Sequence, residues 1–341
     1  MPVAIGVITE TAPGETRVAL VPEVLRKYQK SGAGVAIEAG CGIRAWLPDR
    51  DFQGAAVEPG AAAVLAKADV LLKVQPPSLD EVRALKSGAI VVGFLQPHRQ
   101  QDLIRLMCER RITSFAVELI PRISRAQSMD ALSSQASVAG YKAVLVGASS
   151  LPKFLPMLTT AAGTIRPAKV LIMGAGVAGL QAIATARRLG AIVEAFDVRS
   201  VTKEQVESLG AKFIDTGVKA EGEGGYAREL TAEERQRQQA VVADHVANAD
   251  LVITTAAVPG KPSPRLIDRV TAERMKPGSV IVDLAAEGGG NCELTKPGET
   301  VVQQGVSIIG ALNLAATLPR HASEMYARNL FNFLEPAIAG G

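Results

Sequence analysis

Short apolar runs alternate with amphipathic stretches from Val3 to about Ala116. The runs have the length and composition of buried strands, and the stretches between them have the spacing of helices that cover one face of a sheet. This alternation is typical of a parallel sheet with helices on both faces. The first third of the chain therefore predicts a doubly wound α/β domain.

The alternation stops at a polar segment, residues 118–135, which leads into a helical run from about Ser137 to Ala148. It resumes after Pro167 with a second series of apolar runs that begins KVLIMGAG. The stretch from about Asn313 has helical spacing and is expected to pack back on the first domain. We therefore predict two doubly wound Rossmann-like domains with a cleft between them, one formed by residues 1–136 plus 313–341 and the other by residues 137–312.

Composition narrows the class of protein. Hydrophobic residues make up 48% of the 341 residues and charged residues 21%, which is typical of a cytoplasmic α/β enzyme. The mean hydropathy of +0.18 comes from short runs, none of them near the ~18 residues of a membrane helix, so no direct membrane insertion is expected. The first residues, MPVAIGVITE, lack the features of a signal peptide, so no export is expected.

The net charge argues against a nucleic-acid-binding protein, and the cysteine content argues against a protein stabilised by disulfides or a metal site. The formal net charge is only +3, with basic and acidic residues interleaved, so no nucleic-acid partner is expected. Cys41, Cys108 and Cys292 lie far apart without a paired spacing, so neither a disulfide framework nor a metal site is indicated.

The strongest motif is GAGVAG, which follows an apolar strand and opens a helix expected over Leu180–Leu189. Gly174 permits the tight turn, Gly176 lets a diphosphate approach the backbone, and Gly179 lets the helix lie close to the strand. The free N–H groups at the start of the helix then bind the diphosphate. We take Gly174, Gly176, Val177, Ala178 and Gly179 as the predicted diphosphate turn.

Asp197 ends the next strand, where a carboxylate accepts hydrogen bonds from the adenosine ribose. Its charge repels a 2′-phosphate and favours NAD(H) over NADP(H), although the nearby Arg199 could weaken this preference. Asp197, Val198 and Arg199 are therefore predicted to bind the cofactor.

Groups that could carry a proton during catalysis are scarce. His98, His245 and His321 are the only histidines, and each is more simply a solvated or capping residue. Hydride transfer between two nicotinamide rings needs no proton carrier, so positioning alone can catalyse it. The polar segment provides such positioning groups in Arg122, Gln127, Asp130 and Ser133. The same residues could also form an ordinary interdomain turn with a helix cap at Asp130 or Ser133.

Residues 217–238 are charged and glycine-rich, and they contain a lone aromatic residue, Tyr226. A segment of this kind is either a lid over a binding site or a surface loop without a role. Both alternatives stay open at this point.

Several stretches, among them PRISRAQSMD, GGYAREL, ITTAAVPGKPSP and MKPGSVIVDLAAEGGGNCEL, resemble the NAD(H)-binding domain of proton-translocating transhydrogenases. The resemblance extends from about Thr16 to Pro336. It implies that Arg122, Gln127, Asp130 and Ser133 hold the nicotinamide, and that Tyr226 lies at the tip of a loop that closes on the nucleotide. It also implies that the glycine turn and Asp197 cradle the cofactor, with Ala256 and Ala257 in the same nucleotide site.

The resemblance also implies partners. NAD(H) would bind to this chain, and NADP(H) to a partner domain that docks so that the two nicotinamides meet. A membrane domain would conduct protons, so the chain would be a cytoplasmic component held at the inner (plasma) membrane through partner subunits. The family's NAD(H) domain is a homodimer, which we expect here too. The stretch ALNLAATLP near the C-terminus departs from the family pattern, which leaves the contacts there open.

Alanine dehydrogenases share this architecture and provide the main alternative. The resemblance to that enzyme retains its substrate-binding Arg and Lys at Arg17 and Lys73 but places Gln96 and Glu287 at its catalytic His and Asp. Because Gln96 cannot exchange a proton usefully, oxidative deamination should be lost, and Arg17 and Lys73 are expected to form structural salt bridges in the cleft. An amino-acid dehydrogenase and a non-catalytic NAD-binding module stay open as alternatives to a transhydrogenase component.

Overall fold

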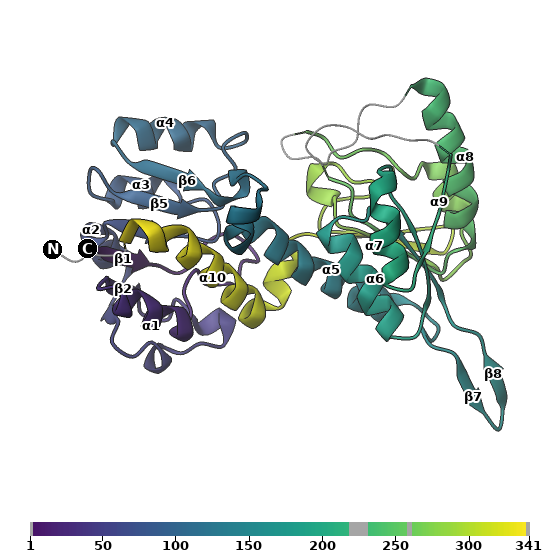
Figure 1. Ribbon diagram of the computed structural model, residues 1–341, viewed down its shortest axis with the longest axis horizontal. Helices are drawn as coiled ribbons and strands as arrows, with labels where there is room; N and C mark the ends of the chain where they lie inside the picture. Colours follow the sequence, from purple (N-terminus) through teal and green to yellow (C-terminus); the bar gives the residue numbers. More distant parts are fainter. Residues whose placement is uncertain (1–2, 218–230, 258–260, 339–341) are drawn as a thin grey trace. The chain divides into compact units, whose positions relative to one another are not determined.

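The computed structural model of the protein describes residues 3–217, 231–257 and 261–338 (Figure 1). The chain divides into two compact units, Met1–Gln135 with Ala315–Gly341, and Ala136–Leu314. Each unit is built around its own largely parallel sheet with helices packed against it. This arrangement confirms the predicted α/β class with two Rossmann-like domains.

The first unit contains a six-stranded parallel sheet with the strand order β3-β2-β1-β4-β5-β6. Winding reverses between β1 and β4, as in doubly wound folds. Its strands are β1 (Ala4–Val7), β2 (Gly34–Glu38), β3 (Ala56–Glu58), β4 (Val70–Leu72), β5 (Ile90–Gly93) and β6 (Thr113–Ala116). Its connecting helices are α1 (Pro22–Lys30), α2 (Ala61–Lys67), α3 (Leu79–Ala84) and α4 (Gln101–Glu109).

Two apolar layers cover the faces of this sheet. Helices α2, α3 and α4 bury Val64, Val82 and Leu103 against one face. On the other face, α1 packs together with α10 (Pro319–Ile338), the last helix of the chain, and the rings of Tyr28 and Phe331 meet edge to face at 5.1 Å. The C-terminal helix therefore completes the core of the first unit.

The second unit contains a seven-stranded sheet with the order β11-β10-β9-β12-β13-β15-β14. Winding reverses between β9 and β12, and the carboxyl edge of such a reversal is where α/β sheets bind ligands. Its strands are β9 (Lys169–Met173), β10 (Ile192–Phe196), β11 (Lys212–Phe213), β12 (Leu251–Thr254), β13 (Val280–Asp283), β14 (Thr300–Gln303) and β15 (Val306–Gly310). Its helices are α5 (Ala131–Ser150, which begins in the first unit), α6 (Val177–Arg188), α7 (Lys203–Ser208), α8 (Ala232–Asn248) and α9 (Arg269–Glu273).

Short 3₁₀ turns connect several of these elements. They are η1 (Ile43–Ala45), η2 (Asp49–Asp51), η3 (Val117–Leu119), η4 (Ser124–Met129), η5 (Ser200–Thr202), η7 (Ala286–Gly288) and η8 (Leu314–Thr317).

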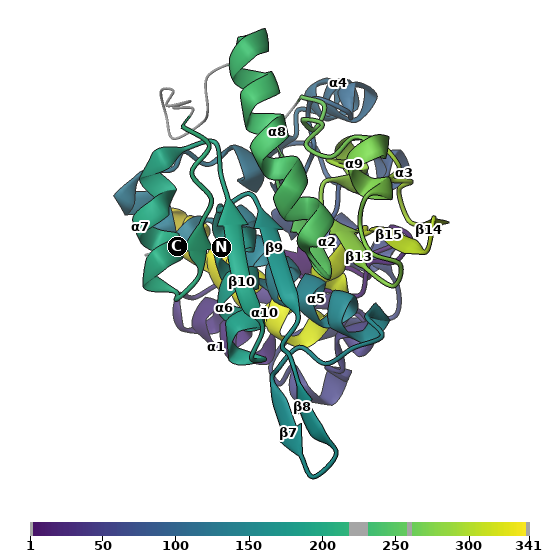
Figure 2. The same cartoon turned by 90° about the vertical axis from the view of Figure 1, so that its right-hand side faces the viewer.

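Four strands did not emerge from the sequence pattern. The strands β3 and β14 are short edge strands, and β14 is antiparallel to its neighbour β15. The other two, β7 (Leu158–Thr160) and β8 (Gly163–Ile165), form a hairpin that extends away from the second sheet (Figure 2). These strands lack a continuous apolar run because at least one of their faces is exposed.

Helix α5 approaches α6 closely in the second unit. A Cβ atom on Gly140 would lie 2.1 Å from the carbonyl oxygen of Ala178, so only glycine fits at this crossing. The contact fixes the first turn of α6, where the predicted diphosphate turn lies. Within the described residues, no helix combines the length and apolar character needed to span a membrane.

Candidate functional site

The glycine turn joins β9 to α6 at the carboxyl edge of the second sheet. Gly174 has a φ of +103°, and a Cβ there would lie 2.5 Å from Thr255 Oγ1. A Cβ on Gly179 would lie 1.8 Å from the carbonyl oxygen of Gly174, so α6 could not lie so close to the turn. Both positions therefore require glycine for steric reasons.

Gly176 differs from the other two glycines because, its chain neighbours aside, no atom of the described residues lies within 4 Å of where its Cβ would be. It is the N-cap residue of α6 and has no side chain that could cap the helix. The helix begins at Val177, three residues before the expected Leu180, so Val177 and Ala178 form its first turn. Open space beside the N-terminus of a 12-residue helix is what binding of a diphosphate requires.

Asp197 follows β10 on the other side of the glycine turn and is 8% exposed. Its Oδ2 accepts a hydrogen bond from Ala175 N at 2.7 Å. The Arg199 side chain grips both oxygens, with Nε 2.9 Å from Oδ1 and Nη2 2.9 Å from Oδ2, and Arg199 N donates to Oδ1 at 2.8 Å. The carboxylate is thus partly neutralised within the protein, and a ribose would have to share it with Arg199.

Sequence reasoning missed Asp283, the last residue of β13, whose carboxylate is fully buried. It accepts hydrogen bonds from the hydroxyls of Thr254 and Thr295 at 2.9 and 2.6 Å and from the N–H of Asn291 at 2.7 Å. Further N–H donors come from Ala285 and Cys292. This carboxylate ties the end of β12 to the loop that follows β13. The only sequence signal is its place at the end of an apolar run, which several acidic residues share.

Ala256 lies two residues after the end of β12, beside the glycine turn, and Ala257 follows it exposed to solvent. Val198 lies between Asp197 and Arg199 and is partly buried. The second unit therefore brings most of the predicted cofactor-binding residues to the carboxyl ends of three adjacent strands. Tyr226 lies outside the described residues.

The predicted nicotinamide segment belongs to the first unit. Asp130 Oδ1 accepts the N–H of Ser133 at 2.8 Å and Oδ2 accepts its hydroxyl at 2.6 Å. Asp130 therefore caps α5, which starts at Ala131 and not near Ser137, because capping stabilises the first turn. Of the four predicted residues, the structure brings Asp130 and Ser133 together, whereas Arg122 and Gln127 are exposed on the preceding segment.

Helix α10 holds this segment in place. The side-chain amides of Asn329 and Asn332 both donate to the carbonyl oxygen of Ser128 at 2.9 Å. Ala126 is buried beneath the turn. The exposed side chain of Gln127 therefore projects from a backbone that is anchored on both sides, which suits a positioning role.

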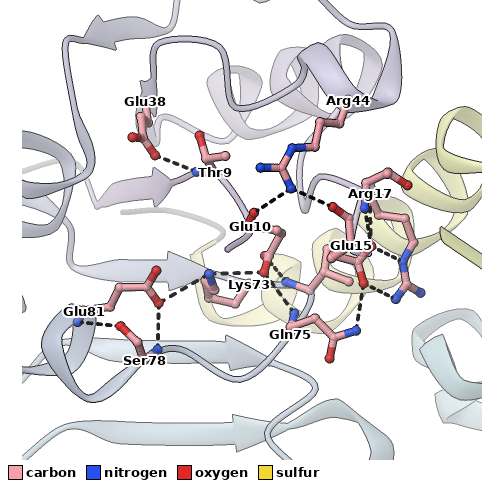
Figure 3. Close-up of polar contacts among 12 residues, drawn as sticks. Thr9, Glu10, Glu15, Arg17, Glu38, Arg44, Lys73, Gln75, Ser78 and Glu81 are labelled. Atoms are coloured by element: carbon pink, nitrogen blue, oxygen red, sulfur yellow. Dashed lines mark hydrogen bonds and ion pairs between the residues drawn. The ribbon is translucent and has the colours of Figure 1, made fainter. Parts of the chain in front are cut away.

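Arg17 forms a buried ion pair with Glu15 (Figure 3). The two groups approach to 2.6 Å, and Arg17 also donates to Gln135 Oε1 at 2.8 Å. Burial opposes ionisation of Glu15, but its hydrogen bonds and charge interaction with Arg17, helped by Gln75, outweigh burial and lower its pKa from 4.5 to about 2. The expected salt bridge of Arg17 is confirmed.

Lys73 is paired as well, with Glu10 at 3.2 Å and Glu81 at 3.4 Å (Figure 3). Burial raises the pKa of Glu10 by more than the neighbouring Lys73 lowers it. The expected salt bridges of Lys73 are therefore confirmed too, and both cations are neutralised inside the first unit.

Gln96 has a φ of +48°, unusual for a residue with a side chain, and its N–H donates to Glu118 Oε1 at 2.6 Å. A hollow of about 390 Å³ beside it lies at the carboxyl edge of the first sheet and is lined by polar uncharged and apolar side chains. Glu287 lies exposed in η7 of the second unit. The side-chain amide of Gln96 does not titrate, so Gln96 provides no proton carrier.

Known protein families match nearly the whole chain. The family described as "Alanine dehydrogenase/PNT, N-terminal domain" matches residues 6–139, and "Alanine dehydrogenase/PNT, C-terminal domain" matches residues 143–341. The first part of the NAD(P) transhydrogenase subunit alpha of Rhodospirillum rubrum, a curated protein, is 49% identical over 345 residues, which cover 98% of this chain and 90% of that protein.

Solved structures give the same two relatives. The transhydrogenase from Sinorhizobium meliloti superposes with a TM-score of 0.89 at 46% identity, covering 98% of this chain and 94% of the other. An L-alanine dehydrogenase superposes with a TM-score of 0.82 at 27% identity, covering 98% and 89% of the two chains. Both share the fold, and the transhydrogenase is the more similar in sequence.

Proposed function

Because the chain belongs to the alanine dehydrogenase/PNT family, we propose that it is the NAD(H)-binding component of a proton-translocating NAD(P) transhydrogenase. The main support for an NAD(H) site is the glycine turn. Two of its glycines are sterically required, and the third leaves space at a helix N-terminus. The identity of 49% to a transhydrogenase subunit over nearly the whole chain favours this activity over that of an alanine dehydrogenase.

In this proposal the N–H groups of the first turn of α6, at Val177 and Ala178, bind the diphosphate of NAD(H). Asp197 accepts the hydroxyls of the adenosine ribose, with Val198 and Arg199 beside it. Ala256 and Ala257 line the other nucleoside, and Tyr226 closes over the bound nucleotide.

Hydride transfer then depends on positioning. Arg122, Gln127, Asp130 and Ser133 orient the dihydronicotinamide toward NADP⁺ held by a partner domain. Bound NADH supplies the hydride, and no side chain of this chain has to give or take a proton in that step. Oxidation of an amine would need a side chain that takes a proton, which Gln96 cannot do. Hydride transfer between two nicotinamides has no such requirement, so Gln96 is consistent with the proposal.

The partners follow from the same proposal. A membrane domain conducts protons and couples their movement to transfer, and this chain acts on the cytoplasmic side of the inner (plasma) membrane through its partner subunits. We also propose a homodimer. The hairpin β7–β8 supports it, because all six residues of its strands are exposed, and with them Met157. Sedimentation of the purified chain at the mass of a monomer would contradict the proposed dimer.

The proposed activity is tested by mixing the chain with an NADP(H)-binding domain of a transhydrogenase. In the reverse direction of the same transfer, the mixture should pass hydride from NADPH to an NAD⁺ analogue such as 3-acetylpyridine adenine dinucleotide, and neither component should do so alone. Production of NADH from alanine and NAD⁺ by the isolated chain would instead support an amino-acid dehydrogenase. NADH binding without transfer in any mixture would support a non-catalytic module.

A further inference from the structure

The backbone after β12 forms one wall of the glycine turn. Thr255 Oγ1 donates to the carbonyl oxygen of Gly174 at 3.1 Å, and Thr255 N donates to Met173 O at 2.8 Å. The N–H nitrogen of Ala256 would lie 3.3 Å from a Cβ on Gly174. The backbone at Thr255 and Ala256 therefore packs directly against the glycine turn.

Asn291 holds Ala256 from both sides of its backbone. Ala256 N donates to Asn291 Oδ1 at 3.0 Å, and Asn291 Nδ2 donates back to Ala256 O at 2.8 Å. The second amide hydrogen of Asn291 goes to Pro264 O, also at 2.8 Å. Because the N–H of Ala256 is bound inside the protein, the contact that Ala256 offers a nucleotide is mainly packing by its methyl group.

Asn291 is itself held rigidly. Its N–H donates to Asp283 Oδ2 at 2.7 Å, and its carbonyl oxygen accepts the N–H groups of Leu266 and Ile267 at 2.8 and 3.0 Å. The residue is 0% exposed, as is Asp283. A buried amide whose backbone and side chain are both fully bonded has a single orientation, so it is a stiff support for Ala256.

The strand order indicates which half of a bound dinucleotide would lie beside Ala256. The strands β10 and β12 flank β9, which carries the glycine turn. A dinucleotide with its diphosphate at the turn and its adenosine at Asp197 must direct its second nucleoside over β12, beside Ala256. On the basis of the proposed function, we propose that Asn291 is a positioning residue for the nicotinamide nucleoside half of NAD(H), acting through Ala256.

The experiment compares two ligands by calorimetry on the full chain. NADH contains both nucleosides, whereas ADP contains only the adenosine diphosphate half. Asn291→Ala should weaken NADH binding roughly tenfold, because it removes both hydrogen bonds to Ala256, and leave ADP binding within about twofold of the unsubstituted protein. Asn291→Ser, which is too short to reach both Ala256 and Pro264, should show the same selectivity and decides the matter if the alanine variant does not fold.

Asp250→Asn is the matched control at the opposite edge of the same sheet. The Asp250 carboxylate accepts Lys169 N at 2.8 Å and Lys153 Nζ at 3.0 Å, so the variant loses a partly buried ion pair and should unfold at a lower temperature. It should leave the ratio of NADH to ADP affinity unchanged. Equal losses for NADH and ADP in the Asn291 variants, or no loss for either, would overturn the positioning role. Failure of the unsubstituted protein to bind NADH would overturn the proposed function and this inference together.

Discussion

The guanidinium of Arg199 grips both carboxylate oxygens of Asp197, two residues before it in the chain. Two backbone N–H donors also bind these oxygens, so a ribose would share the carboxylate with Arg199. The charge of Asp197 would repel the 2′-phosphate of NADP(H). If Arg199 were released from Asp197, its guanidinium could pair with that phosphate. We therefore expect this pair to set the preference between NAD(H) and NADP(H).

Asp197→Asn should reduce that preference. The amide keeps the size of the carboxylate but loses its charge, so Arg199 is freed to approach a 2′-phosphate. We expect the ratio of NADH to NADPH affinity to fall by roughly tenfold or more, measured by calorimetric titration with each nucleotide. Arg199→Met should raise the ratio of NADH to NADPH affinity. An unchanged ratio in both variants would show that this pair does not distinguish the two adenosine riboses.

Gly176→Ala separates binding from folding. Apart from the two chain neighbours, a Cβ at this position meets no atom within 4 Å in the part of the chain that the structure describes, so the thermal unfolding temperature should not fall. The added methyl group occupies the space proposed for the diphosphate, and NADH affinity should drop roughly tenfold or more. Gly60→Ala is the control, because Gly60 is also a helix N-cap with open space at its Cβ but lies in the first unit. Unaltered NADH affinity in Gly176→Ala would place the diphosphate elsewhere.

Gln127→Asn and Asp130→Asn test the positioning segment. Asparagine is as good a helix N-cap as aspartate, so Asp130→Asn should preserve α5 while it removes the charge and the acceptor for the Ser133 hydroxyl. Both variants should slow hydride transfer in the reconstituted mixture by roughly tenfold or more while NADH affinity changes by less than about threefold. The opposite split, with weaker binding and an unchanged rate in the bound state, would mean that this segment supplies affinity.

Glu15→Gln tests the buried ion pair. The pKa of Glu15 is about 2 in the folded protein against an ordinary 4.5, so its ionised form stabilises the fold above pH 4.5. That contribution, about 3 kcal/mol, is lost as the pH falls from about 4.5 through about 2.

The free energy of unfolding in urea should therefore be lower for Glu15→Gln than for the unsubstituted protein at pH 7, and the two should converge toward pH 2. Glu23→Gln removes a surface pair with Arg328 and should have little effect at any pH. A difference between the unsubstituted protein and Glu15→Gln that stays constant from pH 7 to pH 2 would contradict the assignment.

Sequence patterns predicted those parts of the fold that depend on interactions between residues close together in the chain. Strands buried on both faces appear as continuous apolar runs, and the glycine turn appears as a motif because its steric demands arise between residues a few positions apart. The edge strands β3 and β14 and the hairpin β7–β8 were not predicted, since exposed strands need no apolar run. The start of α5 was expected six residues late, because the cap at Asp130 depends on a side-chain geometry that the polar pattern leaves undecided.

Sequence patterns alone were enough to predict the two doubly wound sheets and the turn that is proposed to hold a diphosphate. The folded structure was needed to show that Arg199 pairs with Asp197, that Glu15 neutralises Arg17, and that Asn291 bonds Ala256 while Asp283 holds Asn291. The physical reason is that Ala256 and Asn291 lie 35 residues apart and meet only because β12 and β13 pair in register. A buried amide gains its role from the backbone groups that surround it, and no pattern along the chain encodes which groups those are.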